Sequence, residues 1–224
     1  MPSSMPSLRQ VLAEHPSLLL IDSASARVQV GLWTKGPTWP PAWRTSDTEA
    51  GTGVFDCVEK LLKDADRRIA DVNAFVFCEG PGSVLGIRTA AVALRAWRVI
   101  NPAAATYRYQ SLDLVARALN RPEVNVIADA RRDTWHVARV GAPLQRVPSA
   151  ELRGELVMPE HFRHWTALPT GLGTTPYDVA ALFAALADAD VLHPAPEPDA
   201  FLHEDPSYVT WTPQVHQAPP AKTA

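Results

Sequence analysis

The chain has 224 residues, which is enough for one large domain or two small ones. Apolar residues make up 46% and charged residues 20%, a globular composition that excludes wholesale disorder. The formal net charge of −3 gives no electrostatic argument for binding nucleic acid or an anionic membrane. Two lone cysteines, without partners at metal-ligand spacing, suit a reducing compartment. With no apolar span and no secretory signal in the sequence, we expect a cytoplasmic protein.

The pattern of residues 17–120 predicts a first α/β half, after a loose extension over residues 1–16. Residues 18–22 form an apolar run that ends in an acid, and residues 27–33 alternate polar and apolar side chains. Because a turn of small residues joins these two runs, they predict a β-hairpin. Residues 35–52 predict a loop, with a third strand near Trp43.

Two helices are expected in this half. Residues 54–69 place their apolar side chains on one arc, about 120° wide. Residues 72–78 are nearly all apolar, as in a strand that is covered on both faces. Residues 84–100 predict a second helix that is apolar on nearly every side. Such a helix is buried on more than one side, so it needs either the first helix or a second chain as its neighbour.

The pattern then partly restarts, which predicts a second, smaller α/β half over residues 121–192. After a short helix over residues 111–119, residues 124–129 form another apolar strand that ends in an acid, followed by an alternating strand over 134–140. This repetition is a weak internal symmetry and indicates two related halves. A later helix is expected to begin near Thr175 and Pro176, and residues 193–224 form a proline-rich C-terminal segment.

The strongest local motif is GPGSVLGIR, residues 80–88, at a strand-to-helix junction. Glycines there permit a tight turn, and the free amides of a helix start favour anions. The motif lacks the lysine of a Walker loop and the spacings of a nucleophile elbow or a dinucleotide fingerprint. Two interpretations remain: a tight turn with close helix–strand packing, or contact with an anion or nucleotide through Gly80, Gly82 and Ser83.

Acids and histidines supply the remaining candidates. Asp22 and Asp129 each end a strand before a small turn, so they either hold a metal or its water, or cap the turn. His161 and His164 are three residues apart and lack the glutamate of a helical zinc pair, which favours surface histidines. The arginine pair at 131–132 either meets a phosphate or forms a solvated turn.

Four segments in chain order resemble the TsaB (YeaZ) family: LLLIDSASARVQVGLW, AFVFCEGPGSVLGIRTAAVALRAW, VIADARRDTWHVARV and DPSYV. The most specific is GPGSVLGIR, where family members read GPGSFTGLR. Asp22 matches the aspartate of the family's IDTS-like strand end, and residues 129–131 match its DAR segment. Pro206 and Tyr208 match a C-terminal P-x-Y. The chain departs from the family where Val-Leu replaces Phe-Thr at 84–85.

The resemblance implies an actin-like, ribonuclease-H-like fold of two related α/β halves. It also implies a non-catalytic subunit of the complex that forms N6-threonylcarbamoyladenosine in tRNA, where TsaD is the metal-bearing catalytic partner and a TsaE-like ATPase is a further one. Such a subunit has no catalytic residue, metal or cofactor of its own. The balanced charge of the chain argues against its being the main tRNA binder, so we expect at most indirect contact with tRNA. An adenine nucleotide at or near the partner interface is left open, with Gly80, Gly82, Ser83, Asp22 and Asp129 as its candidate contacts. The family's interface consists of the two helices of the first half, here represented by Val54, Val58, Leu61, Leu85, Val92, Leu94 and Trp97.

Two other functions remain open at this stage. One is a stand-alone, actin-like and nucleotide-dependent phosphotransferase that uses Asp22, Asp129 and Mg²⁺. The other is a self-associating structural protein that forms a homodimer through the same two helices.

Overall fold

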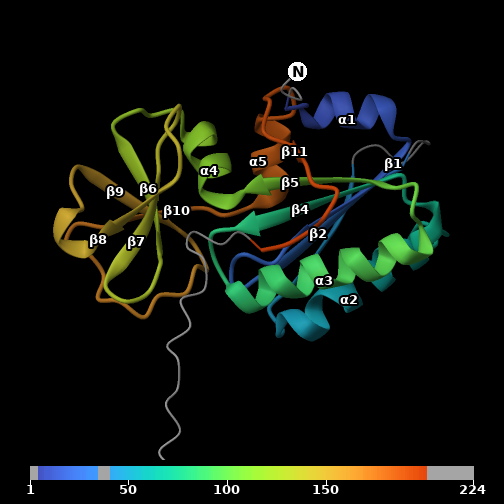
Figure 1. Cartoon of the computed structure of the whole chain (residues 1–224), viewed down its shortest axis with the longest axis horizontal. Coiled ribbons are helices and arrows are strands. Elements are labelled where there is room, and N and C mark those ends of the chain that lie inside the picture. The colour runs from blue at the N-terminus through green and yellow to red at the C-terminus, as the bar shows by residue number, and fades with distance from the viewer. Residues whose placement is uncertain (1–4, 35–40, 201–224) are drawn as a thin grey trace, which may run out of the picture.

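The computed structural model describes residues 5–34 and 41–200, which form two mixed β-sheets with helices packed on them (Figure 1). The first sheet has the strand order β11-β5-β4-β1-β2-β3. β1 pairs antiparallel with β2, which confirms the predicted hairpin, and β2 pairs antiparallel with a strand that contains Trp43. These strands are β1 (Ser17–Asp22), β2 (Val28–Thr34), β3 (Ala42–Ser46), β4 (Ala74–Gly80), β5 (Ala105–Gln110) and β11 (His193–Pro194).

The second sheet repeats the topology of the first. Its order β10-β9-β6-β7-β8 matches β5-β4-β1-β2-β3 position by position, with an antiparallel three-strand unit followed by two parallel strands. The structure therefore confirms the prediction that the two halves are related. Its strands are β6 (Val124–Asp129), β7 (Thr134–Ala138), β8 (Gln145–Pro148), β9 (Glu155–Pro159) and β10 (Gly173–Thr175).

Five α-helices flank the sheets in the described part of the chain. α2 and α3 lie side by side on one face of the first sheet, while α1, α4 and α5 lie on its opposite side (Figure 1). Because successive side chains of a strand point to opposite faces, Leu18 and Leu20 join one core cluster, and Leu19 and Ile21 join the other. The helices are α1 (Leu8–Glu14), α2 (Ala50–Asp64), α3 (Val84–Ile100), α4 (Ser111–Leu119) and α5 (Val179–Ala185).

Three predicted boundaries differ from the structure. Residues 8–14 are a packed helix rather than a loose extension, because Leu8 and Val11 are buried and Ser7 caps the helix. The helix expected over 54–69 spans Ala50–Asp64, and Ile69 begins a separate 3-10 turn. The helix expected to begin near Thr175 begins at Val179, because Thr175 is held in β10 and the carboxylate of Asp178 caps the helix by accepting the amide of Ala181.

The start of the C-terminal segment belongs to the first sheet. β11 pairs antiparallel with β5, and the amide of Ala195 donates to the carbonyl of Thr106 at 2.7 Å. Further along, the side chain of Arg95 in α3 donates to the carbonyl of Pro198 at 2.6 Å and pairs with Asp199. Residues 193–200 therefore cross from the sheet edge onto α3.

Candidate functional site

The glycine-rich motif is packed directly against the turn that follows β1. The amide of Ser83 donates to the carbonyl of Ala24 at 2.7 Å, and the hydroxyl of Ser83 caps α3. A Cβ atom on Gly86 would lie 2.1 Å from the carbonyl oxygen of Ser23. A Cβ atom on Gly82, which has a φ of +153°, would lie 2.3 Å from that of Ala24. Both glycines are therefore required by close backbone approach, and protein backbone fills this side of the motif.

Asp22 is fully buried and is surrounded by protein donors. Its Oδ2 accepts the hydroxyls of Tyr109 at 2.5 Å and Tyr177 at 2.7 Å, and its Oδ1 accepts the amide of Ala24 at 3.0 Å. Burial raises the pKa of this carboxyl, an effect that the hydrogen bonds oppose only in part. Tyr177 follows β10, whereas Asp22 ends β1, so the carboxyl joins the two halves. Of the two interpretations of Asp22, the enclosure of its oxygens by these groups favours capping of the turn over contact with a metal or nucleotide.

Asp129 occupies the equivalent strand end in the second half and is also held by the protein. Its oxygens accept the backbone amides of Arg131 at 2.5 Å, Trp165 at 2.6 Å and Thr166 at 2.7 Å. Burial would raise the pKa of Asp129, but these hydrogen bonds outweigh it and hold the pKa below its ordinary value. Of the two interpretations, these hydrogen bonds favour turn capping for Asp129.

We expect Asp129→Asn to remove part of the acid sensitivity of the fold. Because the pKa of Asp129 is lower in the folded chain than its ordinary 3.8, its stabilising effect is present above 3.8 and is lost as the pH falls through the folded value. As the pH is lowered, the free energy of unfolding of the wild type should therefore fall relative to that of the variant. Urea unfolding of both proteins across this range measures the difference, and an unchanged difference would contradict the assignment.

A pocket of about 340 Å³ lies where α2 and α3 begin. Of the five candidate nucleotide contacts, only Ser83 lines it; Gly80, Gly82, Asp22 and Asp129 do not. Arg163 reaches this pocket from the second half, and Glu49 precedes α2 there. A nucleotide near the motif therefore stays a prediction, and Arg163 and Ser83 would be its contacts. The lining residues are Ser25, Ala26, Val28, Thr48, Glu49, Ala50, Ser83, Leu85, Gly86 and Arg163.

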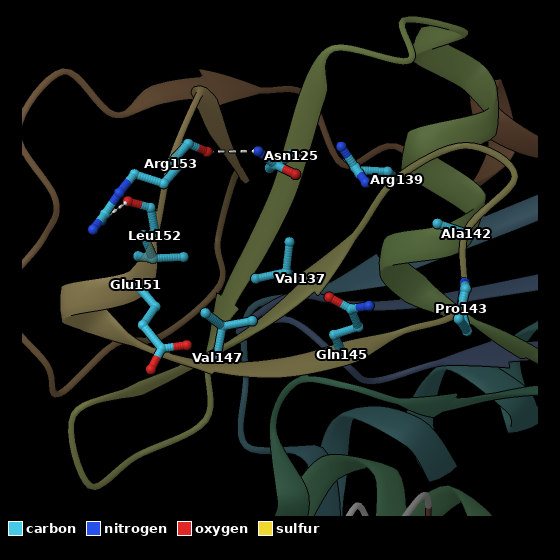
Figure 2. A pocket seen from close by; sticks show the side chains of 10 residues that line it. All are labelled: Asn125, Val137, Arg139, Ala142, Pro143, Gln145, Val147, Glu151, Leu152 and Arg153. Atoms are coloured by element: carbon cyan, nitrogen blue, oxygen red, sulfur yellow. Dashed lines mark hydrogen bonds between the residues drawn. The ribbon is translucent and has the colours of Figure 1, made fainter.

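A second pocket, of about 320 Å³, lies on the outer face of the second sheet (Figure 2). Figure 2 shows Val137 at its centre, with the side chains of Asn125, Arg139 and Gln145 around it. The amide of Asn125 donates to the carbonyl of Arg153 at 2.8 Å, while the side chain of Arg153 points away. This pocket contains no residue that the sequence analysis singled out. More generally, no group of three or more His, Cys, Asp or Glu side chains within residues 5–34 and 41–200 could hold a metal ion.

The outer side of α3 carries an uncovered apolar stripe. Leu85, Val92 and Val99 are 64%, 59% and 83% exposed, and a spacing of seven residues places them on one side of the helix. Thr89 lies between Leu85 and Val92, and Ala96 lies between Val92 and Val99. Successive members of the row are therefore four and three residues apart in turn. We call these five residues the α3 seam. Their spacing is that of the contact positions of a helix that packs against another helix.

Four of the predicted interface residues do not lie on this surface. Val54, Val58 and Leu61 of α2 and Leu94 of α3 are buried in the core between these helices and the first sheet. Burial of these side chains excludes them as surface contacts. The reason is that hydrophobic periodicity identifies an apolar face but not what covers it.

Trp97, another predicted contact on α3, is half-buried. Its ring lies 6.1 Å from that of Phe75 in β4 and 6.1 Å from that of Phe55 in α2. Trp97 therefore fixes α2 and α3 against the sheet. Leu85 and Val92 are the predicted contacts that are exposed, and Val99 was missed although the seven-residue spacing could have revealed it.

Solved structures of other proteins have a similar architecture. The structure of YeaZ from Pseudomonas aeruginosa superposes with a TM-score of 0.58 and 18% identity, covering 76% of this chain and 90% of that one. The chain has the fold of YeaZ. A structure described as an uncharacterized protein with similarity to peptidase YeaZ from Pseudomonas aeruginosa gives the same score and identity, covering 76% of this chain and 89% of that one.

This YeaZ fold is the actin-like arrangement of two α/β halves that the resemblance implied. No protein-family model matches the chain, and no curated protein matches its sequence. Among the described helices, none combines the length and apolarity that crossing a membrane requires. The matched P-x-Y residues, Pro206 and Tyr208, lie outside the described residues.

Proposed function

We propose that the chain belongs to the TsaB (YeaZ) family and is the non-catalytic partner subunit of a complex that forms N6-threonylcarbamoyladenosine in tRNA. A TsaD-like paralogue would carry the chemistry. This chain would bind that paralogue through α3 and hold it in its active arrangement. The YeaZ fold supports the family, and the α3 seam is the observation that carries the role.

The α3 seam supports a helical partner because of its geometry. Apolar side chains at Leu85, Val92 and Val99 lie along one line, and the smaller Thr89 and Ala96 leave space between them. Side chains from a facing helix can insert into such spaces. The core side of α3 is already covered by the first sheet and α2, so the seam is the side that a partner can bury.

The two strand-end aspartates favour a partner subunit over a stand-alone phosphotransferase. Such an enzyme needs carboxylates that face bound Mg²⁺ and phosphate. Here Asp22 accepts two tyrosine hydroxyls and a backbone amide, and Asp129 accepts three backbone amides. Both carboxylates thus hold the protein together.

We expect Val92→Asp and Val99→Asp each to weaken binding to a TsaD-like paralogue by at least about thirtyfold, because each buries an uncompensated charge worth about 2 kcal/mol or more. Co-elution and titration calorimetry with the purified paralogue measure this loss. Leu168→Asp is the matched control, because Leu168 is 47% exposed in the second half and lies outside the seam. Unchanged binding by both seam variants would overturn the proposal.

Light scattering on the same proteins distinguishes a homodimer of this chain from a complex with the paralogue. Light scattering of the chain alone and with the paralogue shows whether a second copy or the paralogue covers the seam. If the chain forms a stable dimer that Val92→Asp dissociates and the paralogue does not displace, the self-associating function is the correct one. A separate titration with ATP and Mg²⁺ tests the phosphotransferase, which requires tight nucleotide binding by the isolated chain.

A further inference from the structure

Exposed cationic and aromatic side chains gather at one end of the second sheet. They come from the turn after β6 and from the loop after β9. Asp129 fixes the two loops together, because its carboxylate accepts the amides of Arg131 and Trp165. We call the following six exposed residues the basic loop cluster: Arg131, Arg132, His161, Arg163, His164 and Trp165.

An arginine–tryptophan pair lies in this cluster. The guanidinium carbon of Arg131 lies 4.4 Å from the centre of the Trp165 ring, and Trp165 is 61% exposed. Arg131 has a φ of +63°, in a turn where Arg132 and Asp133 also have positive φ. The turn and the carboxylate of Asp129 together hold a flat, cationic and aromatic surface toward solvent.

The arginines of the cluster are not held in ion pairs in the described part of the chain. Arg131, Arg132 and Arg163 form no ion pair with any residue in the described ranges, whereas Arg95 and Arg121, for example, do. Asp129, Asp133 and Glu160 are the acids next to the cluster in sequence. Asp129 accepts backbone amides of both loops, and none of the three acids forms an ion pair with the cluster arginines in the described ranges. Among the described residues the three guanidinium groups are thus exposed and unpaired with acids, so they can contact a ligand, although the acids beside them in sequence equal them in number.

We propose that the basic loop cluster binds single-stranded RNA. Unstacked bases stack on exposed aromatic rings and on guanidinium planes, while further arginines contact the phosphates. A protein interface of ordinary size needs a larger apolar area than the single indole of Trp165. The net charge predicted at most indirect contact with tRNA, because a sum over the whole chain does not show a local cluster.

The position of the cluster connects it with the α3 seam. Arg163 lines the same pocket as Leu85, which is the first residue of the seam. RNA on the cluster would therefore lie beside a partner that is docked on α3. The identity of this RNA as tRNA rests on the proposed function, whereas RNA binding by the cluster requires no partner.

Fluorescence anisotropy of a short, labelled single-stranded RNA with the full chain tests the proposal. Trp165→Ala should weaken binding about tenfold, the effect of losing one stacked base. The double variant R131A/R132A should lower the slope of log K against log salt by about 0.7 to 1.4, because about 0.7 counterion is released per phosphate contact. The matched control is R67A/R139A, which removes two exposed arginines that lie outside the cluster. Circular dichroism verifies that each variant is folded.

Binding that requires Trp165 and the 131–132 pair but not the control arginines supports the proposal. Absence of RNA binding by the wild type, or equal loss in the control variant, overturns it. If the cluster variants instead leave RNA binding intact and prevent co-elution with the paralogue, the cluster is a protein interface and the RNA assignment is wrong. Because Val92→Asp tests partner binding alone, failure here and failure of the proposed function are separate results.

Discussion

Asp22→Ala should destabilise the chain by about 3–5 kcal/mol, a large fraction of the stability of an ordinary domain. The substitution removes the acceptor of three hydrogen bonds and leaves the hydroxyls of Tyr109 and Tyr177 buried without it. Because Tyr177 comes from the second half, the variant should also loosen the contact between the halves. Equilibrium urea unfolding, followed by tryptophan fluorescence, measures the loss.

Three further variants separate the hydrogen bonds from the charge. Tyr109→Phe and Tyr177→Phe each remove one donor to the carboxylate and should each cost about 1.5–3 kcal/mol. Asp22→Asn removes the titration. Since the pKa of Asp22 is raised in the folded chain, the wild type loses stability as the pH rises above the ordinary 3.8 toward the folded value. The difference in free energy of unfolding between the wild type and Asp22→Asn should therefore decrease as the pH rises through this range. For Asp129 the corresponding difference should increase as the pH rises. If Asp22→Ala unfolds like the wild type, the buried hydrogen bonds do not hold the halves together.

Gly86→Ala should destabilise the chain by about 2–3 kcal/mol, even though alanine favours helices. The added Cβ atom would lie 2.1 Å from the carbonyl oxygen of Ser23, so either α3 or the turn after β1 must move. Thermal unfolding of the variant measures the cost.

Gly51→Ala is the matched control for this prediction. Gly51 also lies in a helix, α2, and a Cβ atom there meets nothing within 4 Å. The control should therefore raise stability by up to about 1 kcal/mol. If Gly86→Ala is as stable as Gly51→Ala, the close approach between α3 and the turn does not constrain the fold.

Local pattern determined much of this fold from sequence alone. The apolar runs at 18–22 and 124–129 give β1 and β6, because strands that are largely buried on both faces are apolar at most positions. The repeated strand–acid–turn pattern also revealed the relation between the halves, since the same topology needs the same local signals. The excess of apolar residues in 84–100 predicted more than one neighbour for α3, and the first sheet and α2 are two such neighbours.

Other features depended on contacts between residues far apart in the chain. Sequence could not show that Asp22 meets Tyr177, which is 155 residues away, so the acid was a candidate ligand until its hydrogen bonds were known. Periodicity could not separate Leu94, which faces the sheet, from Val92, which faces solvent, because both are apolar and only packing distinguishes them. Net charge likewise could not reveal the basic loop cluster. Arg131 and Trp165 come together only because Asp129 binds the amides of both loops, and tertiary structure alone brings those loops into reach of one carboxylate.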